Sequence, residues 1–194
     1  MRHPAPQVAT ARDEDRAIAT LVLAFVADPA MRWLYPEPSR YLAGFPRLVR
    51  ALGRDAFQKG SVHEVSEFAG VAIWLGPRVA PDEALVGEVI QSTVDAPRVP
   101  RVLEVLAELD RRHPTEPHWY LPFLGVDAPR QRTGLGSTLL QHALAQADRE
   151  HAPAYLETAN PANIPLYQRH GFELAATVEV PSAPMLFPMV RPAR

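Results

Sequence analysis

A glycine-containing loop in the last third of the chain carries the clearest chemical signal. It runs from Gln131 to Gly136, with glycine at positions 134 and 136, and helical periodicity follows it. Glycines let backbone N–H groups approach a ligand closely, and a helix start adds unpaired amides and a positive dipole end. The loop therefore suits a pyrophosphate, although it lacks the GK[ST] ending of nucleoside triphosphate loops and the third glycine of dinucleotide folds. Taken alone, it is equally compatible with a plain strand-to-helix turn.

A second group of residues follows this loop at short intervals. They are Leu156, Glu157, Thr158, Asn160, Asn163, Tyr167, Gly171 and Phe172. Asn163 and Tyr167 are four residues apart, so they share one face if they lie in a short helix. We expect Asn163 to cap that helix and Gly171 to end it. Tyr167 is then either a functional hydroxyl or an aromatic side chain that packs on the sheet.

Together these features resemble the GNAT superfamily of acetyl-coenzyme A-dependent N-acetyltransferases, over about residues 117 to 190. The features are a strand ending in Gly-Val, a QxxGxG loop and an N..N...Y...GF segment. Within the superfamily, three stretches look particularly similar to puromycin N-acetyltransferase and its relatives: EPHWYLPFLGV, PAYLETANPANIPLYQRHGFE and VEVP. The N-terminal half resembles them only in helix order. The resemblance implies an α/β (α+β mixed) fold with a mixed, mostly antiparallel sheet, a splayed parallel pair and helices on both faces.

The resemblance also implies where acetyl-coenzyme A binds. Backbone groups of Leu124, Gly125 and Val126 would contact the thioester and the pantetheine arm, which would lie like an added strand. The pyrophosphate would be held by Gln131, Arg132, Thr133, Gly134, Leu135, Gly136 and Ser137. Further contacts to the coenzyme would come from Asn160, Asn163 and Tyr167.

By resemblance, Tyr167 hydrogen-bonds the coenzyme sulfur and protonates the departing thiolate. A reference tyrosine has a pKa of about 10 and a thiol one of about 8.5, so full proton transfer is uphill by roughly 2 kcal/mol. We therefore expect Tyr167 to act mainly as a strong hydrogen-bond donor.

Attack on the thioester needs a neutral amine and a stabilised oxyanion, for which backbone N–H groups near Gly125 or Val126 are suitable. Two residues are candidate bases, directly or through water: Glu157 at the end of its strand and His118 at the start of the preceding one. Each also has an ordinary structural interpretation, because Glu157 can pair with an arginine and a lone histidine is usually structural. The remaining histidines form no HExxH or comparable pair, so we expect no metal site.

The amine acceptor is expected near the first two predicted helices and their loop. Aromatic side chains and a carboxylate suit a cationic amine, and we expect contacts from Asp28, Trp33, Tyr35, Trp119 and Tyr120. Ordinary packing is the alternative for each of these residues.

Hydrophobic periodicity places these residues on elements. Helices are predicted at about 13–26, 40–58, 83–90, 99–109 and 135–147, and strands at 61–67, 68–75, 118–126, 154–157, 172–180 and 185–190. The order strand, helix, strand after residue 117 is a βαβ unit, and ligands of open α/β sheets bind at the carboxyl ends of such strands. Pro122 cannot donate to a ladder, so it marks either a simple edge or the point where its strand leaves a neighbour.

Length and composition set the limits for function. The 194 residues lack a dividing polar segment, so we expect one domain spanning 1–194. A net charge of -2 disfavours nucleic-acid binding, and the absence of cysteine excludes thiolate chemistry. The sequence has no apolar run long enough for a membrane span and no secretory signal, so we expect a cytoplasmic monomer or homodimer.

The expected activity is acetyl transfer from acetyl-coenzyme A to the primary amine of a small molecule, antibiotic-like or other, by direct attack on the thioester. Two alternatives stay open at this point. One is a non-catalytic acyl-coenzyme A sensor, and the other is acetylation of proteins or peptides.

Overall fold

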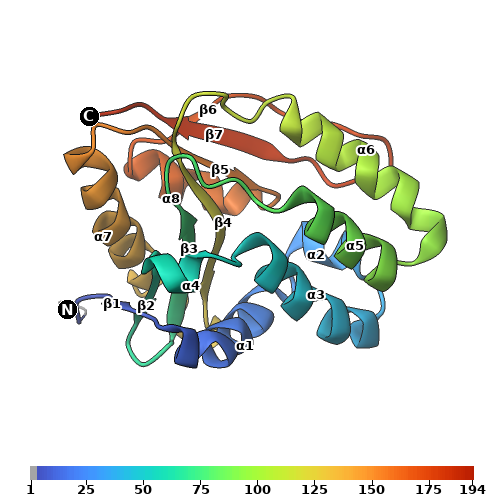
Figure 1. The fold of residues 1–194 in the computed structure, drawn as a ribbon, viewed down its shortest axis with the longest axis horizontal. Helices are drawn as coiled ribbons and strands as arrows, with labels where there is room; N and C mark the ends of the chain where they lie inside the picture. Colours follow the sequence, from blue (N-terminus) through green and yellow to red (C-terminus); the bar gives the residue numbers. More distant parts are fainter. Residues whose placement is uncertain (1–3) are drawn as a thin grey trace.

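A mixed sheet with helices on both faces organises residues 4–194, the part of the chain that the computed structural model describes (Figure 1). The order of its seven strands is β1-β2-β3-β4-β5-β7-β6. Their bounds are β1 Gln7–Val8, β2 Val62–Val65, β3 Gly70–Leu75, β4 Trp119–Val126, β5 Ala154–Thr158, β6 Glu173–Leu174 and β7 Phe187–Arg191. Within these residues β4 and β5 pair in parallel and the other neighbours are antiparallel, which confirms the predicted fold class.

Eight α-helices accompany the sheet within residues 4–194. They are α1 Glu14–Phe25, α2 Pro29–Leu34, α3 Pro38–Leu52, α4 Ala56–Lys59, α5 Glu83–Thr93, α6 Val99–Asp110, α7 Leu135–Arg149 and α8 Ile164–Arg169. Helix α7 buries one leucine- and alanine-rich stripe on the sheet, against residues such as Leu121 and Leu156. Helices α1, α3 and α5 pack on the other face around Phe45 and Phe123. Figure 1 shows α7 and α3 on opposite sides of the strands.

Strands β4 and β5 separate partway along their length. Their parallel pairing ends at Leu121 opposite Leu156, whereas β4 continues to Val126 beside β3. A register shift in β4 accompanies the split, so Leu121 faces α7 while Phe123 faces α1. Pro122 is the first residue beyond the parallel pairing. Of the two interpretations left open for Pro122, a simple edge or the point where the strand leaves its neighbour, the pairing agrees with the second.

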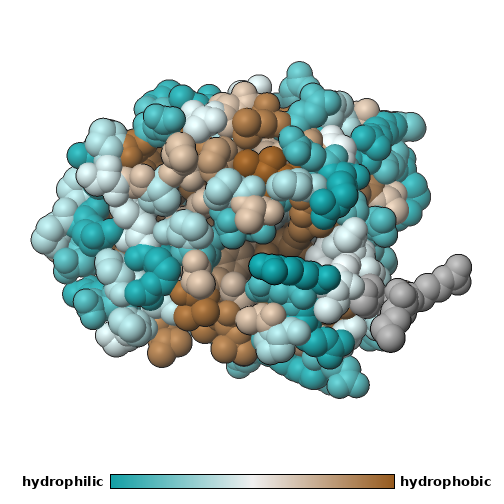
Figure 2. All heavy atoms as spheres, turned by 180° about the vertical axis from the view of Figure 1, so that it is seen from behind, coloured by the Kyte–Doolittle hydropathy of each residue, from teal (hydrophilic) through white to brown (hydrophobic). Residues whose placement is uncertain are grey.

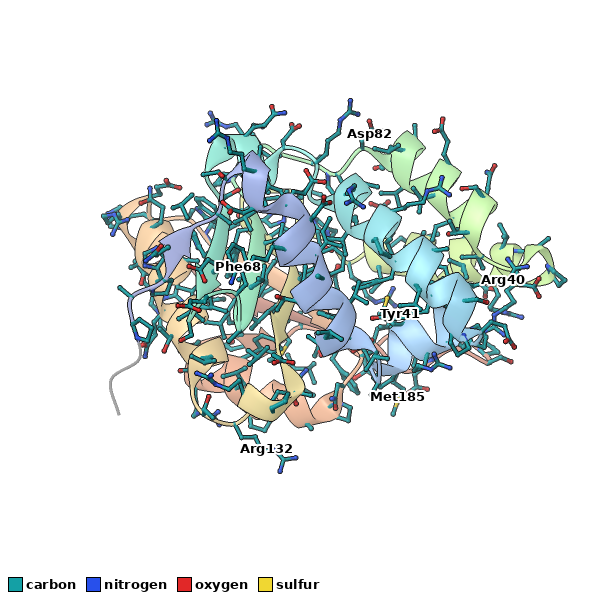
Figure 3. All side chains as sticks on the ribbon, turned by 90° about the horizontal axis from the view of Figure 1, so that it is seen from below. Arg40, Tyr41, Phe68, Asp82, Arg132 and Met185 are labelled. Carbon is teal, nitrogen blue, oxygen red and sulfur yellow. The ribbon has the colours of Figure 1, made fainter. Side chains whose placement is uncertain are left out.

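Gly125 lies where α1 crosses β4. A Cβ at this position would come within 2.8 Å of both the Ala24 Cβ and a Leu21 methyl, so only glycine allows this helix to pack so closely. The close packing fixes the end of α1 beside the split. Figure 3 shows α1 and α3 from below, with Tyr41 between them; its hydroxyl donates to the Val22 carbonyl at 2.7 Å.

The second predicted helix was too long. It ends at Leu52, because the chain turns at Gly53 and restarts as the short helix α4, which buries Phe57. Gly60 then ends α4 in a left-handed conformation with φ 69°. Strand β1 and helix α2 were not predicted from the sequence.

The closing strand pair is shorter than predicted. Only Glu173–Leu174 forms strand β6, and a single bridge, Val178 to Leu186, follows it. The carbonyl of Pro188 on β7 accepts from the Ala175 N–H at 2.9 Å, so the N–H that proline lacks would have pointed to the same side. The ladder loses a donor there and ends.

Residues 76–118 leave the sheet after β3 and return to it at β4, the neighbouring strand. This connection carries α5 and α6, close to where they were predicted. It packs against the N-terminal helices: α5 lies beside α3 in Figure 1, and the Thr93 hydroxyl bonds the Tyr35 hydroxyl at 2.9 Å. No helix between residues 4 and 194 has the length and apolar character to cross a membrane.

Candidate active site

The loop before α7 has the backbone shape of an anion cradle. Arg132 and Gly134 have positive φ of 60° and 98°, and Gly134 stands at the N-cap, where no side chain caps the helix. The Gln131 side chain folds back to donate to the Val126 carbonyl at 3.1 Å. Figure 3 shows the Arg132 side chain extending away from the protein. The Gln131 side chain therefore fixes the loop to the end of β4, while residues 131–134 remain exposed to solvent.

The first turn of α7 has no side-chain cap. A Cβ on Gly136 would be in ordinary van der Waals contact with Leu166 and Val126, at 3.7 and 3.8 Å, so packing does not require glycine at this position. An uncapped helix start with left-handed Gly134 beside it presents amides to an anion. These features fit a pyrophosphate, as the sequence indicated.

Ser137 and His170 connect the start of α7 with the end of α8. The Ser137 hydroxyl and His170 Nε2 lie 2.7 Å apart. Burial, and then the charges of Arg169 and Arg191, hold the pKa of His170 below its usual value. Neutral His170 thus has one ring nitrogen free to accept from Ser137. No sequence motif pointed to this partner.

A mostly apolar cavity of about 240 Å³ opens at the split between β4 and β5. From the sequence-predicted site residues it gathers Asp28, Trp33, Tyr120, Leu124, Glu157, Asn163 and Tyr167. Phe25 and Met31 complete the side nearest α1 and α2. Figure 2 shows a mostly hydrophilic face with apolar residues in a hollow near the middle and in patches above it and at its lower left edge.

Tyr167 is almost fully enclosed, with 7% of its surface exposed. Burial first, and then the nearby charge of Asp28, raise the pKa of its hydroxyl. Tyr167 therefore stays protonated at any working pH and can donate a hydrogen bond. Asp28 itself caps α2, accepting from the amides of Ala30 at 2.9 Å and Met31 at 3.1 Å. Its carboxylate thus has a structural task besides facing the cavity.

A second, larger cavity of about 680 Å³ lies beside the first. It is lined by α5, α6 and the connection from α6 to β4, and it shares Tyr120 and Glu157 with the smaller cavity. Glu157 is the first β5 residue beyond the parallel pairing, and 12% of its side chain is exposed. Its carboxylate therefore lies where the two cavities meet.

Two histidines extend from Glu157 along the wall of the larger cavity. The Glu157 Oε1 atom lies 3.7 Å from His113 Nδ1, and His113 Nε2 lies 3.0 Å from His118 Nε2. The other nitrogen of His118, Nδ1, lies 2.7 Å from the Glu116 carbonyl. Burial is the main cause that lowers the pKa of His118. His113 was not predicted from the sequence, because it belongs to no motif and only the fold brings it close to Glu157.

Three predicted site residues lie elsewhere. Tyr35 is fully buried between helices, where it bonds Thr93, and it lines neither cavity. Trp119 faces α7, and its indole donates to Glu150 at 2.9 Å. The Asn160 side chain caps the single turn Pro161–Asn163 by accepting from Ala162 at 3.1 Å. Asn163 precedes α8 as predicted, but its side chain makes no capping bond.

Comparison with known proteins agrees with this geometry. The model of the acetyltransferase (GNAT) family matches residues 67–172. An uncharacterised N-acetyltransferase of Schizosaccharomyces pombe is 26% identical over 178 residues, covering 84% of this chain and 71% of the yeast protein. No relative described here tests the finer resemblance to puromycin N-acetyltransferase, which stays a prediction.

Solved structures share the whole fold. The structure of histone acetyltransferase HPA2 and related acetyltransferase from Corynebacterium glutamicum has 25% identity and a TM-score of 0.70, with coverage of 100% of this chain and 98% of that one. A mosquito arylalkylamine N-acetyltransferase, like 5b, has 15% identity and a TM-score of 0.66 over 97% and 99% of the two chains, and this likeness concerns the fold alone. Because the family model spans more than half of the chain, the protein belongs to the GNAT family and is an acetyltransferase of that type.

Proposed function

We propose that this acetyltransferase moves an acetyl group from acetyl-coenzyme A to a primary amine of a small molecule, by direct attack of the amine on the thioester. One observation carries the proposal. The split between β4 and β5 opens into a cavity that both Glu157 and Tyr167 line, so a carboxylate that could act as base and a hydrogen-bond donor share one enclosed space.

Acetyltransferases of this family use acetyl-coenzyme A, which supplies an activated acetyl thioester when bound. In this chain the loop from Gln131 to Ser137 would hold the pyrophosphate through amides at the start of α7. Beyond Leu121 the β4 backbone has no β5 partner, so residues 124–126 can pair with an extended ligand. Backbone N–H groups in this stretch are also suitable for stabilising an oxyanion.

Glu157 is our choice for the base. An alkyl ammonium group has a pKa of about 10.4, so it must lose a proton before it can attack. Glu157 lines the cavity at the split and also faces the larger cavity, from which an amine can approach. His118 lines only the larger cavity, so it is less well placed to contact an amine at the split.

Tyr167 would donate a hydrogen bond to the leaving sulfur. Because burial raises the pKa of its hydroxyl, full proton transfer to a thiolate is even less favourable than for an exposed tyrosine. Its contribution is therefore stabilisation of developing negative charge inside an apolar enclosure.

A small amine suits the enclosed, aromatic-lined cavity, in which Trp33 and Tyr120 can contact a cation. The name of the mosquito structural neighbour is in keeping with this, at the level of fold. A peptide acceptor is the second candidate, because the larger cavity is open and the Corynebacterium neighbour is described as a histone acetyltransferase and related acetyltransferase. The presence of both Glu157 and Tyr167 argues against a sensor that catalyses nothing.

A thiol-release screen tests the proposal. Acetyl-coenzyme A is offered with a panel of arylalkylamines, aliphatic amines, amino sugars, aminonucleosides and lysine-containing peptides. We expect turnover with a small amine, at a kcat/KM above that for any peptide. Better turnover of peptides would favour the second candidate, and saturable coenzyme binding without thiol release would favour a sensor.

A further inference from the structure

The histidine pair beside Glu157 has no part in the function proposed so far. His113 lies in the connection between α6 and β4, and His118 lies just before β4. Both rings pack against aromatic residues of the β4–β5 pair, with the His113 ring 4.9 Å from that of Tyr120 and 4.5 Å from that of Tyr155, and the His118 ring 5.8 Å from that of Tyr155. The fold thus encloses two imidazoles between a buried carboxylate and a large open cavity.

The hydrogen bonds determine which ring nitrogen of each histidine carries the hydrogen. Since His118 Nδ1 lies 2.7 Å from a carbonyl oxygen, it must carry a hydrogen, and neutral His118 then accepts at Nε2. His113 must therefore donate from Nε2 across the 3.0 Å contact, which leaves Nδ1 facing Glu157. In this arrangement His113 donates from Nε2, and its Nδ1 lone pair lies 3.7 Å from Glu157 Oε1, a separation longer than a hydrogen bond that must shorten before a proton can pass.

We propose that His113 relays the proton that Glu157 takes from the acceptor to His118 at the wall of the larger cavity, and that the acceptor is an alkyl ammonium compound. The proposal rests on the proposed function and deepens it. An amine that is already neutral in solution loses no proton before it attacks, and the proton that its nitrogen loses after attack can go to the departing thiolate, so no net proton has to leave the site. A relay of this kind therefore points to an aliphatic amine as the substrate class.

Each step moves one proton and no other bond changes. The acceptor N–H bond breaks as the Glu157 O–H bond forms, giving a neutral amine and a neutral carboxyl group. Glu157 then passes the proton to His113 Nδ1, while the Nε2 proton of His113 moves to His118 Nε2. His118 becomes an imidazolium and releases a proton to water in the open cavity. Exchange with water restores the starting tautomers.

The surroundings suit this path. Tyr120 and Tyr155 form its walls, and burial raises the pKa of both hydroxyls, so they remain protonated and hold no negative charge. The charged and titratable groups that face the pair from the surrounding elements are Glu157 and Tyr155 on β5, Tyr120 on β4, Asp110 and Arg112 at the end of α6, Glu116 in the connection, and Arg78 and Glu83 across the cavity. Glu108 binds Arg112 in an ion pair at 2.6 Å, which ties that cation to α6.

The test compares two acceptors in His113→Gln. One is a primary alkylamine, which is protonated at neutral pH, and the other is an alkoxyamine of similar size, which is neutral. Because general acid–base catalysis contributes about 10²- to 10⁴-fold, we expect kcat/KM for the alkylamine to fall about 10- to 100-fold. For the alkoxyamine we expect less than a threefold change. The loss should also shrink as the assay pH rises towards the pKa of the alkylamine.

Chemical rescue gives an independent readout. In His113→Ala, added imidazole should restore alkylamine turnover in a saturable manner and leave alkoxyamine turnover unchanged. His118→Gln should produce the same selective loss, and it keeps the test available if His113 variants do not fold. The matched control is His142→Gln, an exposed histidine on α7 at the other face of the sheet, which should change neither acceptor.

The outcomes separate this inference from the proposed function. If the wild-type protein acetylates both acceptors and the histidine variants lower both equally, or neither, His113 is structural and the relay is wrong. If none of the acceptors offered leads to thiol release by the wild-type protein, the proposed function fails and the relay fails with it. Nitrogen-15 NMR of the histidine rings offers a check without turnover, since we expect the Nδ1–H tautomer for His118 and the Nε2–H tautomer for His113.

Discussion

The two ends of the candidate active site are built in different ways. At the donor end, one continuous segment from β4 through α7 offers mainly backbone groups: a left-handed Gly134, an uncapped helix start and an unpaired strand edge. At the acceptor end, side chains come together from distant parts of the chain, as when His113 meets Glu157 of β5. A site made of backbone groups tolerates many side-chain substitutions but few changes of backbone conformation. A site made of side chains should lose activity when a single functional group is removed.

Glu157→Gln should give the largest effect at the acceptor end. The substitution keeps the shape and removes the base, so we expect kcat for an alkylamine to fall about 10²- to 10⁴-fold while donor affinity changes little. Steady-state kinetics and calorimetry with coenzyme A measure the two quantities. Glu104→Gln on the outer side of α6 is the control and should change neither. A normal kcat in Glu157→Gln would show that Glu157 is not the base.

Gly134→Arg should abolish donor binding, because φ of 98° strains any side chain there and an added side chain crowds the anion cradle. A ligand at 100 times its Kd raises the unfolding free energy by about 2.7 kcal/mol, so this stabilisation by coenzyme A should disappear. Gly87→Ala on α5, where a Cβ meets nothing within 4 Å, should retain it. Normal coenzyme binding by a folded Gly134→Arg variant would mean that the pyrophosphate lies elsewhere.

Tyr167 stands between the two ends, and Tyr167→Phe tests which of them it serves. A hydrogen bond to a charged group is worth about 1.5–3 kcal/mol, so kcat should fall about 10- to 100-fold with donor affinity nearly unchanged. The measurement is kcat together with the Kd for coenzyme A. A large loss of affinity would assign Tyr167 to donor binding, and unchanged turnover would leave it a packing residue.

The smallest expected effect is on folding stability at acid pH. It involves His63, whose ring packs against His142 of α7. Burial, with the nearby His142 next, lowers the pKa of His63 to about 4. The unfolded chain binds this proton below a pKa of about 6.5, so stability should fall as pH drops from about 6.5 to about 4, by at most about 3 kcal/mol. His63→Leu should reduce that loss in urea unfolding across this pH range, whereas His151→Gln should not. Equal acid sensitivity in His63→Leu would mean that other groups cause it.

The sequence predicted the donor end better than the acceptor end, for physical reasons. Glycine turns, helix starts and strands are local signals, so the loop before α7 was predicted, and Pro122 was narrowed to two interpretations, a simple edge or the strand split. Tyr35 and Trp119 were assigned to the acceptor by residue type, but strand alternation turns Trp119 towards α7 and helix packing buries Tyr35. His113 depends on the path of residues 76–118, which no local pattern specifies. The single-domain organisation and the cytoplasmic location stay predictions.

A crystal structure of the protein with coenzyme A and a primary alkylamine tests the central claim most directly. We expect the pyrophosphate on the amides at the start of α7, the pantetheine arm in the split between β4 and β5, and the amine nitrogen within hydrogen-bonding distance of Glu157. A coenzyme bound outside the split, or an amine nitrogen away from Glu157, would contradict the account.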